Sequence, residues 1–308
     1  MTRSDDRIEI ALGDPLYPAC VSELPDAPGV LYVRGDPKVL DRPSLSIVGS
    51  RKATPYGLAI AEMAGRIAAE SGLAVVSGGA RGCDQAAGLA SIDAGGVHVV
   101  VLGTGADVVY PASARRLIER ALDGGGAVVS LEPWGTPPQR WAFPKRNRVI
   151  AALSSATLVS EAGMPSGTFS TAEAAVSLDR EVLAVPGSVF SPESRGSNYL
   201  IANGACCIAD EEALEVAISR IYGTLRFARC DASDTVKLSQ CDQEIVSTLI
   251  ANPQRVEELA WHRGEDSLTC LRHLSRLELD GVVVRLADGR YSLTKSALHA
   301  RTRLGHNS

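Results

Sequence analysis

The sequence has no long hydrophobic run and no C-x-x-C motif. No apolar stretch reaches the roughly 18 residues that a membrane-spanning helix needs, and the polar first 14 residues show no apolar segment of secretory length. The seven cysteines are scattered without a C-x-x-C pair, so we expect no structural zinc. The adjacent pair Cys206-Cys207 is expected to be small buried filler at a strand. These absences favour a reduced cytoplasmic setting and no membrane partner.

Catalytic motifs are also missing. The sequence has no G-x-x-x-x-G-K-[S/T] phosphate loop, no H-E-x-x-H motif and no acid-rich metal loop. Of five histidines, only His98 falls in the predicted sheet domain, where it begins a strand instead of following one. We therefore expect no metal, no cofactor and no enzymatic activity.

Positive charge is in deficit as well. The net charge is −5, and phosphate contacts supply most of the non-specific affinity for nucleic acids. A nucleic-acid partner would therefore need a local cationic groove on an acidic protein.

What the sequence does have is a regular alternation of short apolar runs and helix-period segments. Six apolar runs of strand length occupy 45–49, 74–77, 98–103, 127–131, 156–160 and 181–187. Strands this apolar are buried on both faces, as in parallel sheets covered by helices. The pattern predicts an α/β fold, a Rossmann-like doubly wound parallel sheet, over residues 45–222.

Different patterns flank this region. Residues 1–44 contain six prolines and one short apolar run, VLYVRG, and we expect an irregular extension packed on the sheet domain. Residues 223–239 lose the apolar periodicity and are interpreted as a linker. Residues 297–308 form a polar tail.

The stretch 240–296 has an organisation of its own. Helix-period segments are expected at about 240–251, 255–262 and 266–280, and two apolar runs then flank Asp288-Gly289, a hairpin signal. Three helices and a hairpin in this order predict a small winged-helix domain.

Loops rich in glycine, serine and threonine follow most of the predicted strands. They contain Gly49-Ser50-Arg51-Lys52 after the first strand and Arg81 among three glycines after the second. Ligands of parallel α/β sheets bind at the carboxyl ends of the strands, where glycine admits close backbone approach and helix N-termini favour anions. Several such loops on one edge predict a rim that binds a nucleotide or a polyanion.

The segment 139–151 adds positive charge and aromatic rings. Cations follow a phosphate chain, and an aromatic ring offers a stacking surface to an unpaired base. The competing interpretation is a solvated charge run whose rings lie in the core. The position of the segment after a strand favours the binding interpretation. Its residues of interest are Arg140, Trp141, Phe143, Lys145, Arg146 and Arg148.

Two alternatives stay open from the residues alone. The rim carboxylates Asp84 and Glu161 could serve as general acid or base in a nucleotide-cleaving enzyme, although a role in orienting an arginine or a loop is favoured. The winged helix could instead bind duplex DNA. Its third helix carries Arg272, His273 and Arg276, but these are balanced by four acidic residues.

Successive blocks of the chain resemble the DprA (DNA-processing protein A, Smf) family. These blocks are SIVGSRKATPYG, SGGARGCDQAA, VLGTGADVVYP, FPKRNRVIA and SGTFSTAEAA. The resemblance implies a single-stranded-DNA-binding protein that protects incoming DNA and loads the RecA recombinase during natural transformation. It also implies a homodimer without catalytic activity and a C-terminal winged helix. As a departure from longer members, we expect their N-terminal SAM-like domain to be missing here.

The resemblance also implies a set of DNA-binding residues. Arg51, Lys52 and Arg81 match basic positions of the first two loops. The expected DNA-binding residues are Gly49, Ser50, Arg51, Lys52, Gly78, Arg81, Gly82, Phe143, Lys145, Arg146, Asn147, Arg148, Ser166, Gly167 and Thr168. The chain departs from the family pattern at Gly88, where a histidine is usual, and at Gly79, where a bulkier apolar residue is usual.

Overall fold

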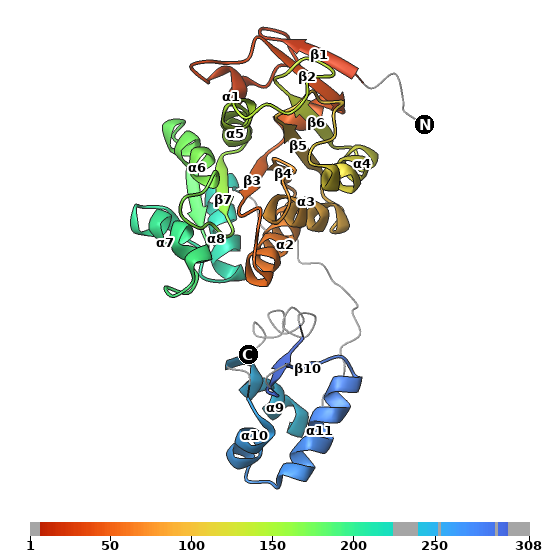
Figure 1. The fold of residues 1–308 in the computed structure, drawn as a ribbon, viewed down its shortest axis with the longest axis vertical. Helices are drawn as coiled ribbons and strands as arrows, with labels where there is room; N and C mark the ends of the chain where they lie inside the picture. The colour runs from red at the N-terminus through yellow and green to blue at the C-terminus, as the bar shows by residue number, and fades with distance from the viewer. Residues whose placement is uncertain (1–6, 224–239, 252–253, 287–288, 295–308) are drawn as a thin grey trace. The chain divides into compact units, whose positions relative to one another are not determined.

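The structure is a computed structural model that describes residues 7–223, 240–251, 254–286 and 289–294. The chain divides into two compact units, residues 1–229 and 230–308, and each is described by itself (Figure 1). Most of the predicted linker and the whole predicted tail lie outside the described residues.

A nine-stranded sheet forms the centre of the first unit, with the strand order β1-β2-β6-β5-β4-β3-β7-β8-β9. Strands β3 to β9 are parallel, which confirms the predicted Rossmann-like α/β fold. The strands are β1 (Arg7–Ala11), β2 (Val30–Gly35), β3 (Ser44–Val48), β4 (Ala74–Ser77), β5 (His98–Leu102), β6 (Ala127–Ser130), β7 (Ala156–Val159), β8 (Glu181–Ala184) and β9 (Cys206–Cys207).

The connections between strands reverse direction once. From β3 the chain steps outward to β4, β5 and β6, and then α5 returns it across β3 to β7. The helices are α1 (Ala19–Ser22), α2 (Pro55–Glu70), α3 (Cys83–Asp93), α4 (Arg115–Asp123), α5 (Ala142–Leu153), α6 (Thr168–Ser177), α7 (Arg195–Ala202) and α8 (Glu211–Tyr222), with short 3-10 turns at Pro37–Asp41, Ala112–Ala114 and Pro192–Ser194.

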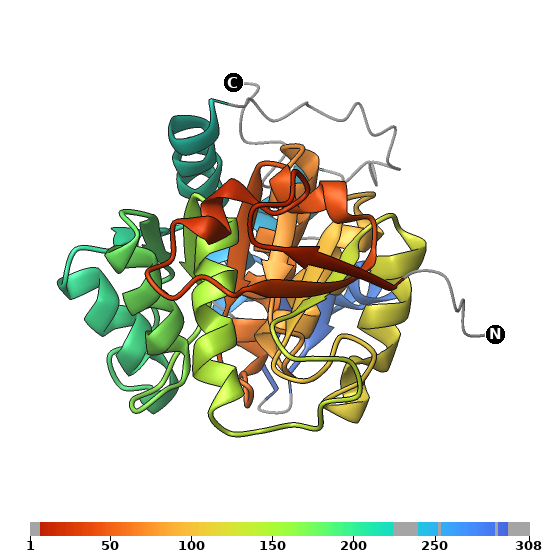
Figure 2. The same cartoon turned by 90° about the horizontal axis from the view of Figure 1, so that it is seen from above.

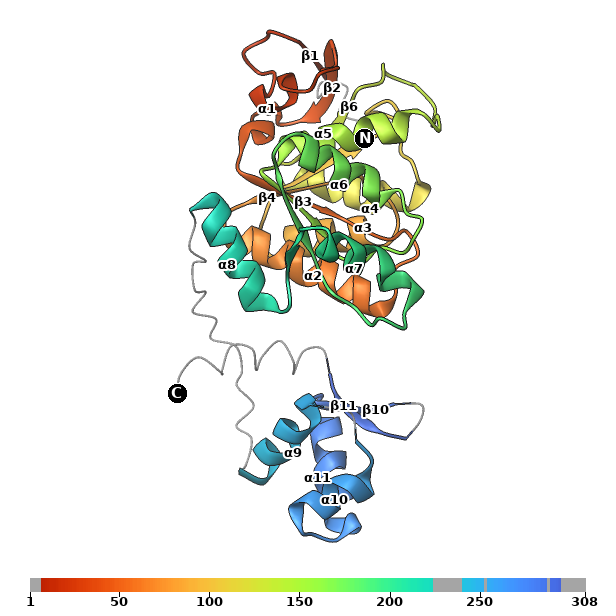
Figure 3. The ribbon, with the colours of Figure 1, turned by 90° about the vertical axis from the view of Figure 1, so that its left-hand side faces the viewer.

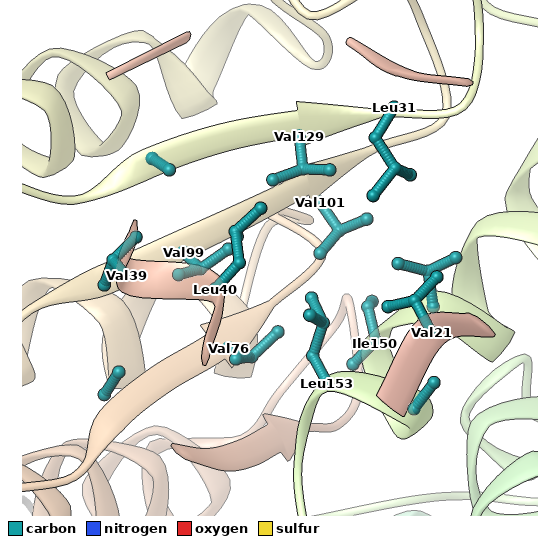
Figure 4. Packing of buried hydrophobic residues seen from close by; sticks show 14 of the residues in the cluster. Val21, Leu31, Val39, Leu40, Val76, Val99, Val101, Val129, Ile150 and Leu153 are labelled. Carbon is teal, nitrogen blue, oxygen red and sulfur yellow. The ribbon is translucent and has the colours of Figure 1, made fainter. Parts of the chain in front are cut away.

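Helices cover both faces of the sheet. Alternate strand residues point to opposite sides, so the apolar side chains of the parallel strands need cover on both. On one face Val76, Val101 and Val129 pack against Ile150 and Leu153 of α5 (Figure 4). On the other, strand residues pack against α2, α3, α4 and α8, which gives three layers (Figure 3). Helix α5 is also tied to the central strand, since Ser46 Oγ donates to Ile150 O at 2.7 Å.

The N-terminal segment differs from the expected irregular extension. Its residues 7–11 and 30–35 form β1 and β2, and β2 joins the sheet antiparallel to β6 through pairs such as Tyr32 with Ser130 (Figure 2). Buried and partly exposed side chains alternate along β2, and Leu31 and Val33 are the buried ones. The partner strand is almost a hundred residues away, which is why local sequence did not show the pairing.

The second unit contains α9 (Gln240–Ala251), α10 (Val256–Arg263), α11 (Ser267–Leu279) and the antiparallel pair β10 (Val283–Arg285) and β11 (Tyr291–Leu293). This is the predicted order of elements, with a hydrophobic core of its own. Asp266 begins α11 by accepting from the backbone N–H groups of Leu268 and Thr269. Two residues of the hairpin turn, 287–288, lie outside the described residues.

Within the described ranges, no helix combines the length and the hydropathy that crossing a membrane would need.

Candidate functional site

A cleft of about 720 Å³ lies at the carboxyl edge of the sheet. It opens where β3 and β7, the two strands at which the chain reverses, end side by side. Open α/β sheets bind ligands at such a point. Ten of the residues expected to bind DNA line it, namely Gly49, Ser50, Arg51, Lys52, Phe143, Arg146, Asn147, Ser166, Gly167 and Thr168.

The loop after β3 supplies the exposed cations of the cleft, Arg51 and Lys52. Ser50 fixes this loop, because its N–H donates to Glu161 O at 2.8 Å and its Oγ accepts from Lys52 N at 3.1 Å. A Cβ at Gly49 would lie 2.7 Å from Cys83 Sγ. The glycine therefore lets the loop close onto α3.

Glu161 belongs to the framework of the site. It is 2% exposed, and its carboxylate accepts from Thr54 N at 2.9 Å and from Thr54 Oγ1 at 2.5 Å. Thr54 in turn begins α2, where Pro55 takes the first helical position. The sequence placed Glu161 on the rim, whereas the structure buries it as the anchor of α2.

Asp84 is the other carboxylate considered as an acid or base. It lines the base of the cleft but is 6% exposed, and it accepts from the N–H groups of Gly78 at 3.0 Å and Ala80 at 3.4 Å. Burial raises the pKa of Asp84, while the nearby charge of Arg146 and these backbone donors lower it. The carboxylate shapes the loop after β4 that contains Gly78, Gly79 and Gly82, here called the second glycine loop. This agrees with the loop-orienting role favoured from sequence.

Arg146 lies in the floor of the cleft, with only 4% of its surface exposed. Its Nη1 donates to Val101 O at 2.5 Å, and a Cβ at Gly78 would overlap the guanidinium. Burial lowers the pKa of Arg146 to about 10, so that the group is still cationic at neutral pH. It supplies fixed positive charge beneath the ligand space, with little surface to offer a phosphate directly.

Two aromatic rings form one wall of the cleft. The rings of Phe143 and Tyr110 lie 5.8 Å apart, and the guanidinium groups of Arg51 and Arg146 lie 5.7 and 5.9 Å from the Phe143 ring. A Cβ at Gly103 would come within 2.9 Å of the Phe143 ring. Tyr110 was not among the predicted binding residues, although its place after a strand, in the block VLGTGADVVYP, was a usable signal.

The opposite wall is the N-terminus of α6. Ser166 Oγ accepts from Thr168 N at 3.2 Å, and Asn147 of α5 donates to Ser170 Oγ at 2.8 Å. These bonds hold α5 and α6 together beside the cleft. Ser166 engages the N–H groups of Thr168 and Phe169, so the attraction of this wall for an anion comes from the positive end of the α6 dipole.

Five of the expected residues do not line the cleft: Gly78, Arg81, Gly82, Lys145 and Arg148. Gly82 has a positive φ of 86° and passes so close to Ser50 O that a Cβ would overlap it. Arg148 forms an ion pair with Asp26 of the N-terminal segment. Arg81 and Lys145 are exposed. Trp141 is also exposed but outside the lining, whereas Arg140 belongs to it.

The unusual Gly88 has a structural partner in His98. A Cβ at Gly88 would lie 2.6 Å from His98 Nε2, so the imidazole of His98 takes the space beside α3. The same nitrogen lies 3.3 Å from Ser77 Oγ at the end of β4. The imidazole of His98, which comes from β5, thus occupies the space next to Gly88, the position where a histidine is usual in the family.

The cysteine pair of β9 differs from expectation. Cys206 is half-buried and Cys207 is exposed, because β9 is a two-residue edge strand with side chains on alternate faces. In the part of the chain that the structure describes, no three histidine, cysteine or acidic side chains gather as metal ligands.

The third helix of the second unit has its cations partly engaged. Asp242 of α9 is buried and lies 3.2 Å from His273 Nδ1, and it also pairs with Arg276. Both partners belong to α11, the helix that a winged helix would present to duplex DNA. Two of its three basic residues are therefore tied to the fold.

Comparison with known proteins places the first unit in a family. The family model described as DNA recombination-mediator protein A matches residues 9–218. Protein Smf of Escherichia coli K12 is 33% identical over 296 residues, which cover 92% of this chain and 77% of that protein. The DNA processing protein DprA of Streptococcus pneumoniae R6 is 38% identical over 192 residues, covering 62% of this chain and 67% of that protein.

Solved structures agree with the sequence comparison. The X-ray structure of DprA from Streptococcus pneumoniae matches with a TM-score of 0.64 and 35% identity, over 68% of this chain and 74% of that chain. DprA from Helicobacter pylori, whose structure concerns a single-stranded DNA binding mode, matches with a TM-score of 0.62 and 28% identity, over 67% of this chain and 94% of that chain. The chain therefore belongs to the DNA recombination-mediator protein A family of DprA and Smf proteins.

Proposed function

We propose that the cleft binds single-stranded DNA and that the protein acts as a recombination mediator, protecting incoming strands and loading RecA on them in the cytoplasm. One observation carries this proposal. The exposed cations Arg51, Lys52 and Arg140 share a single cleft with the rings of Tyr110 and Phe143. Cations with aromatic rings suit a polynucleotide whose bases are unpaired.

The chemistry of the cleft favours binding over cleavage. Glu161 is committed to Thr54, and Asp84 is committed to the second glycine loop. Both carboxylates thus accept hydrogen bonds from the framework of the site, which supports an orienting role over acid–base chemistry on a bound nucleotide. Because the net charge is −5, the affinity must come from this local surface, and it should weaken steeply with salt.

The binding step is tested by titrating a labelled unstructured oligonucleotide and a matching duplex. We expect the single strand to bind more tightly, and Arg51→Ala to weaken it by at least about tenfold, the loss of one charge-assisted contact. Arg42→Ala is the matched control, since Arg42 is exposed just before β3, at the opposite edge of the sheet. Equal affinity for single strand and duplex, or equal effects of the two substitutions, would refute the cleft as the binding site.

The mediator step needs its own measurement. RecA assembly on single-stranded DNA that is already coated by a single-strand-binding protein should be faster with the wild-type chain than with Arg51→Ala. The proposal includes a homodimer, which sedimentation of the full chain measures directly. DNA binding without any effect on RecA assembly would restrict the function to protection of the strand.

A further inference from the structure

Arg115 and Arg116 form the start of α4. Arg115 and Arg116 are exposed and form no ion pair with any residue that the structure describes. The first turn of α4 contains no acidic residue, and cations there face the positive end of the helix dipole. Arg120 contrasts with them, because it lies in the last turn and pairs with Asp93 at 2.7 Å.

These arginines adjoin the second glycine loop. Gln85 Nε2 donates to Gly79 O at 3.0 Å and to Ser113 Oγ at 3.1 Å, which joins that loop to the turn preceding α4. A Cβ at Gly79 would also lie 3.9 Å from Ala114 Cβ. Arg81 is exposed on this same loop, which adjoins the turn that leads into Arg115 and Arg116.

The surface made by Arg81, Arg115 and Arg116, here called the α4 patch, continues directly from the cleft. Ala80, the residue before Arg81, lines the cleft, and so does Tyr110, which precedes the turn leading into α4. Cations thus extend from the loop after β3, across the loop after β4, to the start of α4. Outside the lined cleft, the patch offers guanidinium groups that form no ion pair with any of the described residues.

We propose that the α4 patch is a second DNA-binding surface, which carries the sugar–phosphate backbone after the strand has passed the aromatic wall at Tyr110. This proposal rests on single-stranded DNA binding in the cleft. Guanidinium groups bind phosphate oxygens through paired N–H donors, and the free first-turn arginines of α4 become favourable once a polyanion lies over them. A ligand that occupies the cleft and the α4 patch together is a polynucleotide.

The test compares Arg115→Ala/Arg116→Ala with Arg120→Ala, a matched substitution on the same helix, in the full chain. Fluorescence anisotropy measures binding of oligothymidylates of about 4 and about 16 nucleotides over a series of salt concentrations. For the long oligomer, the double variant should show a salt slope shallower by about 1.4, since each contact with a single strand contributes about 0.7. The short oligomer should bind all three proteins alike.

Two results would overturn the α4 patch. One is a double variant that binds the long oligomer with the wild-type slope. The other is an equal loss for both lengths, which would mean that the arginines act through the cleft. Failure of the cleft itself has a different signature, because wild-type protein would then bind neither oligomer, or Arg51→Ala would bind both normally.

Discussion

Arg146 and Arg51 carry the same charge within one cleft but differ in burial. Arg146 is enclosed, with Val101 O as acceptor and Asp84 nearby, whereas Arg51 is exposed above Phe143. The first is therefore a positioning residue that holds the floor and the second glycine loop. The second is free to contact a ligand.

Their alanine variants should separate folding from binding. Arg146→Ala removes the stronger of the two positive charges that act on buried Asp84 and leaves only Arg51, so we expect a loss of about 3 kcal/mol in the free energy of unfolding, together with weaker DNA binding. Arg51→Ala should weaken binding with an unchanged melting temperature. Thermal melts and oligonucleotide titrations of both variants check this, and a stable, non-binding Arg146→Ala protein would contradict the structural role.

His98 makes the stability depend on pH. Burial lowers its pKa to about 4, whereas an unfolded histidine titrates near 6.5. Between these values the unfolded chain binds a proton that the folded chain does not, so the free energy of unfolding falls as the pH drops from about 6.5 towards about 4. The slope approaches about 1.4 kcal/mol per pH unit. Above about 6.5 this contribution is constant.

Urea unfolding at about pH 7.5 and about pH 5 measures the effect. His98→Gln should reduce the difference in stability between the two conditions. His262→Gln is the control, because His262 is exposed on α10 and should leave that difference intact. An unchanged pH dependence in His98→Gln would show that other groups produce it.

At the scale of elements, the parallel strands were predictable and the edge strands were not. The runs that became β3 to β8 are mostly apolar, a pattern that depends only on burial from both sides. Strand β1 has no such run, and its place is decided by β2, which itself pairs with the distant β6. The alternation of buried residues in β2 fits a strand, but it does not identify the distant strand with which β2 pairs.

The cleft was predictable to a similar degree. Loops after parallel strands must meet at one edge, which brought Arg51 and Ser166 together as expected. Charge alone does not show whether an arginine of α5 faces solvent, the floor or another element. Arg146 and Arg148 are two residues apart on one helix, so they point in different directions, and only tertiary packing decides their partners.

The role of α5 yields a prediction about Arg148. Its ion pair with Asp26 is half exposed on both sides, and such surface pairs contribute about 0 to 1 kcal/mol. Arg148→Ala should therefore lower stability only slightly and leave the single-stranded DNA affinity within about twofold. Asp26→Ala should behave in the same way. A large loss of affinity in Arg148→Ala alone would place this arginine in the DNA-binding surface after all.

At the scale of the whole molecule, the cleft and the α4 patch both belong to the first unit. The second unit has a separate core, and its α11 is held by Asp242. We therefore expect residues 1–222 to bind single-stranded DNA within about twofold of the full chain, and residues 236–308 alone to shift no duplex DNA. Gel-shift titrations of the three proteins decide this. A duplex shift by the C-terminal fragment would support a transcription-regulator role.

The pairing of β3 with β7 affects both the folding and the lifetime of the protein. Leu45 and Ala156 are paired neighbours although they are far apart in the chain, and contacts of such high sequence separation form slowly. The cleft does not form until β3 and β7 have paired. A chain that is still being synthesised, or one that is partly unfolded, therefore lacks the site that would bind single-stranded DNA. DNA binds only the folded protein. By mass action it therefore lowers the population of unfolded protein, which is the form that proteases attack.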